Sequence, residues 1–247
     1  MSLKEGLSRS AGARSIGAVL RRIVPLAALA WAAPAAAPIC RPIADTFHLD
    51  RRIDSPGVAL TFDDGPHPDG TPAILELLAD AGATATFFLV GEQVERYPEV
   101  ARAVAEQGHE VALHGFRHTL LLRRTVRELA DDLARAHALI EDVTGVSPRL
   151  YRPPYGVFSL GGLLHARRRW QPLLWSTWGR DWTHRATPAS VARRATRNLG
   201  PGDVVLLHDA DHYSVEGSWR VTAGALPAIL EAVQALGAPF VPCTQAT

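Results

Sequence analysis

Short apolar runs alternate with helical patterns along most of the chain after residue 57. The runs are rich in Val, Leu and Phe and are bounded by Gly, Pro or Asp, which is typical of strands buried in a sheet. Segments with apolar residues at helical spacing separate these runs, so the pattern predicts a parallel sheet joined by crossover helices. The predicted strands are residues 58–62, 84–89, 109–114, 149–151, 171–177, 203–208 and 239–241.

The segments between the runs carry signals for helix ends. Thr71 and Thr187 are each followed by proline, which is the pattern of an N-cap with proline in the first turn. Thr125 and Glu128 have the spacing of a capping box, and Gly145 is placed to end the helix that follows. These signals predict helices in the crossover positions.

Seven βα units can close into a barrel or lie open as a doubly wound sheet. In both arrangements the functional side chains gather at the carboxyl ends of the strands. A chain of 247 residues, 47% of them hydrophobic, is expected to form one α/β domain with a sizeable core.

The charge argues against a nucleic-acid partner, and the cysteine content excludes a four-cysteine zinc site. The formal net charge of +1 gives no reason to expect a nucleic-acid partner. The two cysteines, Cys40 and Cys243, cannot form a four-cysteine zinc site and allow at most one disulfide bond, whose formation the sequence leaves open.

The first 45 residues differ in composition from the rest of the chain. Five basic residues lie near the start: Lys4, Arg9, Arg14, Arg21 and Arg22. A nearly uncharged, alanine-rich run follows over residues 23–39, which predicts a signal peptide and a secreted or cell-envelope protein. Its length and three prolines argue against a simple transmembrane span, and a retained, membrane-associated helix is the alternative. We expect a monomer.

Two adjacent carboxylates, Asp63 and Asp64, end the first predicted strand. One of them can bind a cation while its neighbour accepts a proton, although Asp-Gly-Pro is also ordinary turn chemistry after a strand. His114 ends the third predicted strand, and His118 follows four residues later. Two histidines at this spacing can reach one metal ion, and chance pairing is the alternative.

Further polar residues follow later strands. Arg152 can hold a carboxylate, and the backbone N–H of Tyr155 can face an oxyanion, unless the segment is only a proline-rich loop. His208 ends the sixth predicted strand, and Asp181 lies in the loop after the fifth. The polar and aromatic segment 208–213 is expected near these residues, either to contact sugar or as a solvated loop.

The motifs TFDDGP, HxxxH, RPPYG, DW and LLHD occur in this order between residues 56 and 243. In order and spacing they resemble the polysaccharide deacetylases, the NodB-like carbohydrate esterases. The resemblance implies a catalytic domain over residues 56–243 with a distorted, seven-stranded (β/α) barrel. It also implies one divalent metal ion, commonly zinc, and an acetylated glycan or glycolipid as substrate.

The resemblance assigns a role to each matching residue. Asp63 is the general base, His208 is the general acid, and the metal ligands are Asp64, His114 and His118. Tyr155 provides the oxyanion N–H and Arg152 orients Asp63, whereas Asp181 and Trp182 support that arginine and wall the site. Leu206 lines the pocket for the acetyl methyl group.

Two positions depart from the family pattern. Gly115 stands where Ser or Thr is usual, and Trp178 stands where an aspartate is common. Neither change removes a metal ligand or a proton-transfer group, so both are expected to affect the tuning of the site.

Other functions are weaker alternatives. The same site would also suit a deformylase or amidase acting on a lipid-linked amido-sugar, and a catalytically silent carbohydrate-binding barrel is a third reading. A nucleotide-binding open sheet is disfavoured, because no GxGxxG motif or P-loop follows the first predicted strand.

Overall fold

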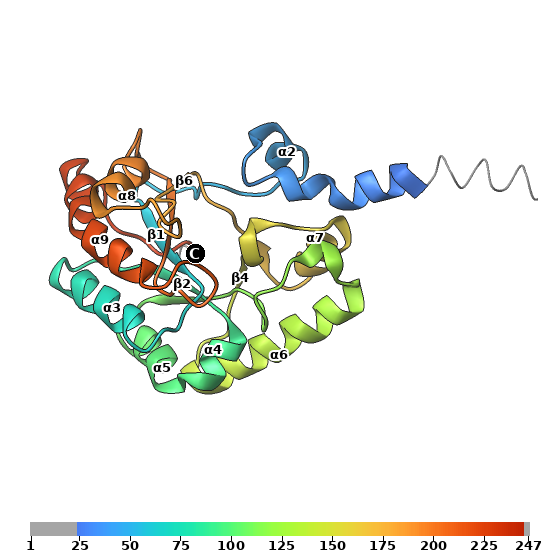
Figure 1. Ribbon diagram of the computed structural model, residues 1–247, viewed down its shortest axis with the longest axis horizontal. Helices are drawn as coiled ribbons and strands as arrows, with labels where there is room; N and C mark the ends of the chain where they lie inside the picture. The colour runs from blue at the N-terminus through green and yellow to red at the C-terminus, as the bar shows by residue number, and fades with distance from the viewer. Residues whose placement is uncertain (1–23, 245–247) are drawn as a thin grey trace, which may run out of the picture.

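A computed structural model describes residues 24–244. Its centre is a curled, parallel seven-stranded sheet with the strand order β5-β4-β3-β2-β1-β7-β6 (Figure 1). The strands are β1 Ala59–Asp63, β2 Thr86–Leu89, β3 Glu110–Leu113, β4 Leu150–Tyr151, β5 Gln171–Pro172, β6 Thr177–Trp178 and β7 Val204–His208. This confirms the expected distorted (β/α) barrel.

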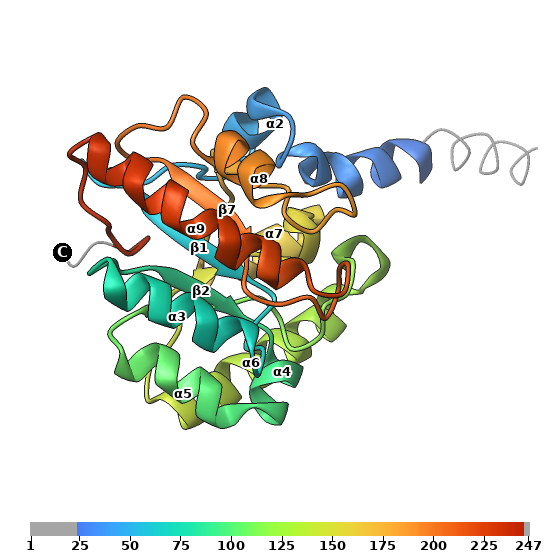
Figure 2. The same ribbon diagram turned by 60° about the vertical axis from the view of Figure 1, so that its left-hand side comes forward.

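The larger helices lie along the outer side of the sheet (Figures 1 and 2). They are α3 Gly70–Asp80, α4 Gly91–Arg96, α5 Pro98–Glu106, α6 Val126–Thr144, α7 Leu160–Ala166, α8 Pro188–Ala195 and α9 Ser218–Ala235. Two short 3-10 helices, η2 Leu121–Arg123 and η3 Pro154–Gly156, lie in the loops. Because helices cover the outer face, the central strands are almost completely buried and their apolar runs form the core.

Two of the three predicted helix starts are confirmed. Thr125 forms a capping box with Glu128, and Thr187 forms one with Ser190. Thr71 is not an N-cap as predicted, because α3 already begins at Gly70. Its hydroxyl instead accepts a hydrogen bond from the His67 N–H and donates one to Asp209, which ties the helix to the loop after β7.

Two of the predicted strands are wrong. Residues 171–177 form two strands, β5 and β6, which lie at opposite edges of the sheet. The chain leaves the first edge after Leu173, which pairs with Asp50, and reaches the second edge where the Ser176 N–H bonds to the Val204 carbonyl. Residues 239–241 add only an isolated bridge between Phe240 and Val58. The sheet still has seven strands, because residues 171–177 contain two strands and residues 239–241 contain none.

The N-terminal segment packs beside α7. A helix that extends to residue 32 is followed by η1 Ala33–Ala36 and α2 Arg41–Thr46. Pro34, Ala37 and Ala44 are buried, whereas the apolar side chains of Val24 and Leu29 are exposed. In the described part of the chain, no helix is both long and apolar enough to cross a bilayer. Much of the predicted leader, residues 1–23, lies outside the described residues.

The two cysteines lie in different parts of the structure. Cys40 precedes α2 and is partly exposed, and Cys243 is buried near the end of the described chain. Both are free thiols in the structure.

Candidate active site

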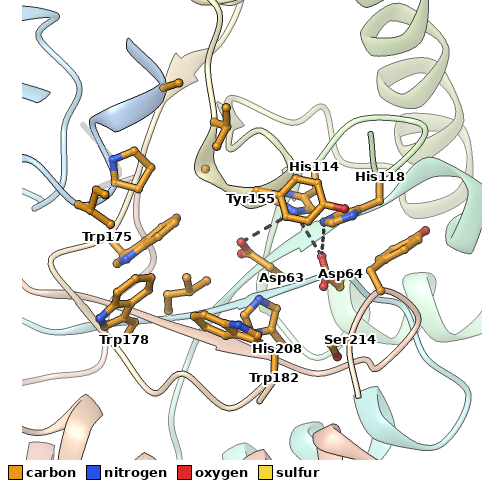
Figure 3. Close-up of a pocket in the computed structure, with 17 residues that line it drawn as sticks. Asp63, Asp64, His114, His118, Tyr155, Trp175, Trp178, Trp182, His208 and Ser214 are labelled. Atoms are coloured by element: carbon orange, nitrogen blue, oxygen red, sulfur yellow. Dashed lines mark ion pairs between the residues drawn. The ribbon is translucent and has the colours of Figure 1, made fainter. Parts of the chain in front are cut away.

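A pocket of about 370 Å³ opens at the carboxyl ends of the strands (Figure 3). Eight of the ten residues singled out from the sequence line it: Asp63, Asp64, His114, His118, Tyr155, Trp182, Leu206 and His208. The other two, Arg152 and Asp181, are buried behind this lining and contact it through hydrogen bonds. The parallel sheet therefore gathers residues that lie far apart in the sequence.

Asp64 lies between the two histidines that were predicted to bind a metal. Its Oδ1 is 3.3 Å from Nε2 of His114 and 3.2 Å from Nε2 of His118. One ligand atom from each of these three residues lies within 4.8 Å of the other two. Asp64 has a positive φ of 80°, which a non-glycine residue rarely adopts and which is typical of functional sites.

The backbone fixes the tautomer of His114. Its Nδ1 lies 2.8 Å from the carbonyl oxygen of Arg152, which can only accept a hydrogen bond. Nδ1 therefore carries the proton, and in the neutral ring the lone pair on Nε2 points at Asp64. This is the arrangement that prepares a histidine to bind a metal ion.

The Asp64 carboxylate fits a cation site. Burial raises the pKa of Asp64, but the close imidazoles of His114 and His118 and the charge of His208 hold it well below its usual range. Among the described residues no group donates a geometrically good hydrogen bond to the buried Oδ1 of Asp64. A buried anionic oxygen beside two imidazole nitrogens is a donor set that zinc and similar divalent ions bind.

Asp63 is held by Arg152. The guanidinium donates to Oδ1 of Asp63 at 2.6 Å and to the Thr61 hydroxyl at 2.9 Å. It also donates to the carbonyls of Leu173 and Leu174, and it stacks on the ring of Phe88. Because Arg152 is fully buried and four of its five N–H groups make hydrogen bonds, Asp63 has little freedom to rotate.

Asp181 pairs with His208. Its carboxylate accepts hydrogen bonds from the His208 backbone N–H at 2.7 Å and from Nδ1 of the ring at 2.9 Å. Asp181 was expected to support Arg152, but within residues 24–244 no hydrogen bond joins the two, and the other hydrogen bond to Asp181 comes from the Thr222 hydroxyl. Burial lowers the pKa of His208, but Asp181, Asp64 and Asp63 outweigh it and raise the pKa to about 10. His208 is thus an imidazolium ion near neutral pH.

Tyr155 and Trp182 border the pocket from different loops. Tyr155 lies in η3 with a positive φ of 61°, and its ring contacts His118 edge to face. Trp182 contacts the imidazole of His208 edge to face, with ring centroids 5.2 Å apart. Leu206 lies on β7 beside Trp178 of β6 and also reaches the pocket.

The loop that carries His118 has Gly115 at the position where the resemblance leads us to expect Ser or Thr. Gly115 has a φ of +91°, a conformation in which an L side chain is strained. The next residue, Phe116, donates its N–H to Oδ2 of Asp132 on α6 at 2.7 Å. Oδ1 of Asp132 also lies 3.6 Å from Nη2 of Arg124. We infer that Asp132 steadies this loop where a Ser or Thr side chain is missing.

Tyr213 is a site residue to which sequence reasoning gave no role. Its ring stacks on the imidazole of His118, and its hydroxyl donates to Glu92 at 2.5 Å and accepts from Gln93 at 2.8 Å. The only signal in the sequence was the polar and aromatic segment 208–213. Nothing there indicated which residue would face the pocket, nor that α4 would hold it.

A second cluster of His67, Asp211 and His212 has the spacing of a metal site, but its hydrogen bonds argue against one. Nδ1 of His67 accepts N–H groups from Asp69 and Gly70, and burial lowers the pKa of this histidine. The neutral ring therefore carries its proton on Nε2, which faces Asp211 at 3.2 Å. This nitrogen has no lone pair for a metal, so the contact holds the loop after β7.

Comparisons with known proteins agree with this geometry. The profile of the polysaccharide deacetylase family matches residues 50–166. A chitooligosaccharide deacetylase of Azorhizobium caulinodans is 34% identical over 73% of this chain and 89% of its own length. Peptidoglycan-N-acetylmuramic acid deacetylase PdaC of Bacillus subtilis is also 34% identical, over 65% of this chain, but the chain spans only about a third (34%) of that relative.

Solved structures share the fold. The Bc1960 peptidoglycan N-acetylglucosamine deacetylase, in complex with a naphthyl hydroxamate, superposes with a TM-score of 0.72 at 28% identity, over 78% of this chain and 89% of that chain. A CE4 family pseudoenzyme from Bacillus anthracis superposes with a TM-score of 0.69 at 26% identity, over 78% of this chain and 66% of that one. The fold alone therefore does not establish activity. The chain belongs to the polysaccharide deacetylase family.

Proposed function

We propose that this protein hydrolyses N-acetyl groups on a cell-envelope glycan. One observation carries the proposal: Asp63, fixed by Arg152, lies in the same pocket as the Asp64, His114 and His118 cluster and the charged His208. A silent binding barrel does not need a fixed base, a metal cluster and a charged acid in one pocket. The printed names of the relatives, which act on peptidoglycan or chitooligosaccharides, support this substrate class.

The chemistry requires one divalent metal ion, for which we propose zinc. Asp64, His114 and His118 would hold it, and it would supply Lewis acidity toward the acyl oxygen and toward water. Three protein ligands are the number usual for a catalytic zinc site. The lone pair of His114 and the anionic Asp64 both suit this ion.

Two groups transfer protons in the proposed mechanism. Asp63 accepts a proton from the attacking water. Arg152 holds Oδ1 of Asp63 by a hydrogen bond, so that Oδ2 of the same carboxylate is free to face the pocket. His208 donates a proton to the departing sugar amine, and Asp181 keeps that imidazole charged and oriented. Proton transfer of this kind contributes about 10²–10⁴-fold to a rate.

The remaining residues position the substrate. The N–H of Tyr155 is proposed to donate to the acyl oxygen as it gains negative charge. Trp182 packs against His208 and offers an indole face to a sugar ring, and Leu206 is placed to meet the acetyl methyl group.

The compartment follows from the substrate and the leader. We propose that residues 56–243 form the catalytic domain and that residues 1–45 direct the chain to the cell envelope, where acetylated glycans occur. Fusion of residues 1–45 to a reporter that is active only outside the cytoplasm tests this. A reporter that stays inactive and soluble would contradict export.

A panel of acetylated glycans tests the activity. The zinc-loaded full chain is incubated with peptidoglycan, chitooligosaccharides and a formylated amino-sugar, and released acetate and formate are measured. Acetate from a glycan supports the proposal, and formate alone would favour a deformylase. Asp63→Asn is the matched control, because it preserves the shape of the base and removes its charge. Absence of turnover by a zinc-loaded, folded protein would overturn the proposed activity.

A further inference from the structure

We propose that Pro38, Ile39 and Trp178 form an apolar subsite that extends the active-site pocket. This subsite would take a hydrocarbon or aromatic group carried by the substrate beside the reacting acyl bond. The inference rests on the proposed function for the position of the reacting bond, and it names a substrate class that the family resemblance does not imply.

The subsite is continuous with the metal cluster. Pro38, Ile39 and Trp178 line the same pocket as Asp64 and His118. Figure 3 shows Trp175 and Trp178 on the side of Asp63 away from Asp64 and His118. A substrate bound at the metal cluster can therefore extend past Asp63 toward the two indoles.

The aliphatic side chains at this end of the pocket offer no hydrogen bonds. Pro38, Ile39 and Val157 are apolar, and the indole rings of Trp175 and Trp178 pack with centroids 5.6 Å apart. A sugar hydroxyl placed against the three aliphatic side chains would lose its water without gaining a partner. The lining therefore favours a hydrocarbon or aromatic group.

Trp178 is one of the two departures from the family pattern. Where the resemblance leads us to expect an aspartate, this chain places an indole against the indoles of Trp175 and Trp182. The exchange replaces a charge by a large apolar surface at the pocket wall. Trp178, like Pro38 and Ile39, therefore makes the pocket more suitable for an apolar group of the substrate.

The N-terminal contribution is packed firmly in place. Pro34 and Ala37 are buried, and Pro38 lies against Gly156. A Cβ on Gly156 would come within 3.1 Å of Pro38 and 2.5 Å of the Trp175 ring, so only glycine allows this approach. This wall comes from residues that precede the match to the family profile, which begins at residue 50.

Ile39 is the side chain that a ligand would cover. It lines the pocket and yet is 78% exposed, so an apolar group bound beside it would remove its surface from water. Burial of a side chain of this size is favourable by an amount that corresponds to about a three- to tenfold gain in affinity when the burial is partial.

Binding of hydroxamates tests the acyl side of the reacting bond. Acetohydroxamate, benzohydroxamate and 4-phenylbenzohydroxamate are titrated calorimetrically into the zinc-loaded full chain, and into Ile39→Ser and Trp178→Asp. The ratio of aryl to acetyl affinity should be about tenfold or more in the original protein and should fall about three- to tenfold in each variant. Leu164→Ser is the matched control, since Leu164 is an exposed apolar residue of α7 outside the pocket.

Glycosides test the carrier side. Acetate release is compared between the octyl and methyl glycosides of N-acetylglucosamine, with the same variants. A fall in apolar preference in either series supports the subsite and assigns the side that it serves. If the variants keep the same preference for apolar groups in both series, the proposed subsite is wrong. The same holds if Ile39→Ser changes only the dependence of turnover on chitooligosaccharide length. If the original protein binds none of the hydroxamates, the proposed metal site is contradicted instead. If it binds them but releases no acetate from any glycan, the proposed activity is contradicted.

Discussion

The ring of Tyr213 lies flat on the imidazole of His118, with centroids 4.1 Å apart and planes 10° apart. The usual restraint on a metal-binding histidine is a hydrogen bond from its second ring nitrogen. Within residues 24–244, Nδ1 of His118 is buried and has no such partner. The stacked ring, tied by Glu92 and Gln93, takes over this restraint.

Removal of the Tyr213 ring should therefore weaken metal binding. We expect Tyr213→Ala to raise the zinc dissociation constant about 10- to 100-fold, as is typical when an outer partner of a metal ligand is lost. Tyr213→Phe keeps the stacked ring and should have a smaller effect. Competition with a chromogenic chelator measures both constants. Equal affinities in Tyr213→Ala and the original protein would show that the ring does not position His118.

The two adjacent aspartates should separate into a ligand and a base. Asp64→Ala, His114→Ala and His118→Ala should each lose bound metal, because each removes one of three ligand groups. Asp63→Asn should keep the metal and lose about 10²–10⁴-fold in turnover. Elemental analysis with acetate assays checks both. Normal metal content in Asp64→Ala, or none in Asp63→Asn, would reverse the assignment.

Neutralising Asp181 should move the alkaline limb of the pH profile. Asp181 is the main group that raises the pKa of His208 to about 10, so Asp181→Asn removes that support. His208 would then lose its proton at a lower pH, and the alkaline limb should shift down by roughly one to three pH units. The acid limb of the profile should stay in place. A limb that does not move would mean that another group is the acid, with His212 and His67 the next candidates.

Asp209 should make the metal-free fold less stable as the pH rises. Burial raises the pKa of this carboxyl from 3.8 to about 7. A raised folded-state pKa contributes stability that is present below 3.8 and lost as the pH rises to about 7. The full difference corresponds to roughly 4 kcal/mol at about 1.4 kcal/mol per pH unit.

Thermal unfolding of metal-free Asp209→Asn checks this. Relative to the original protein, the variant should gain in Tm between pH 5 and pH 8, since asparagine does not ionise. Asp142→Asn, which changes an exposed aspartate of α6, is the control. If the two variants respond alike to pH, the Asp209 carboxyl is not the source of the effect.

Much of the site could be predicted from the sequence because parallel strands end at one edge of the sheet. Asp63, His114 and His208 each follow a recognisable apolar run, so their meeting follows from the topology. The pairing of Asp181 with His208 does not, because Asp181 lies in a loop whose path depends on long-range packing. Tyr213 was missed for the same reason.

The strand error has a physical cause. Residues 171–177 are centred on the apolar stretch 172–175, which resembles one buried strand although β5 and β6 lie at its two ends. A change from one edge of the sheet to the other leaves no mark on such a run. For residues 33–46 the composition is misleading in another way. Their small, apolar composition suggests a leader, but side chains of the same kind are also suitable for packing beside α7.

The packing of residues 33–39 makes the position of any N-terminal cut a determinant of pocket shape. A cut within the segment Ala30-Trp31-Ala32 leaves Pro34, Pro38 and Ile39 in the mature enzyme and keeps the apolar wall. A cut after Ala37 leaves Pro38 as the new terminus, places a positive charge beside Trp175 and removes the buried anchors Pro34 and Ala37. The two cuts would therefore leave two differently shaped active-site pockets.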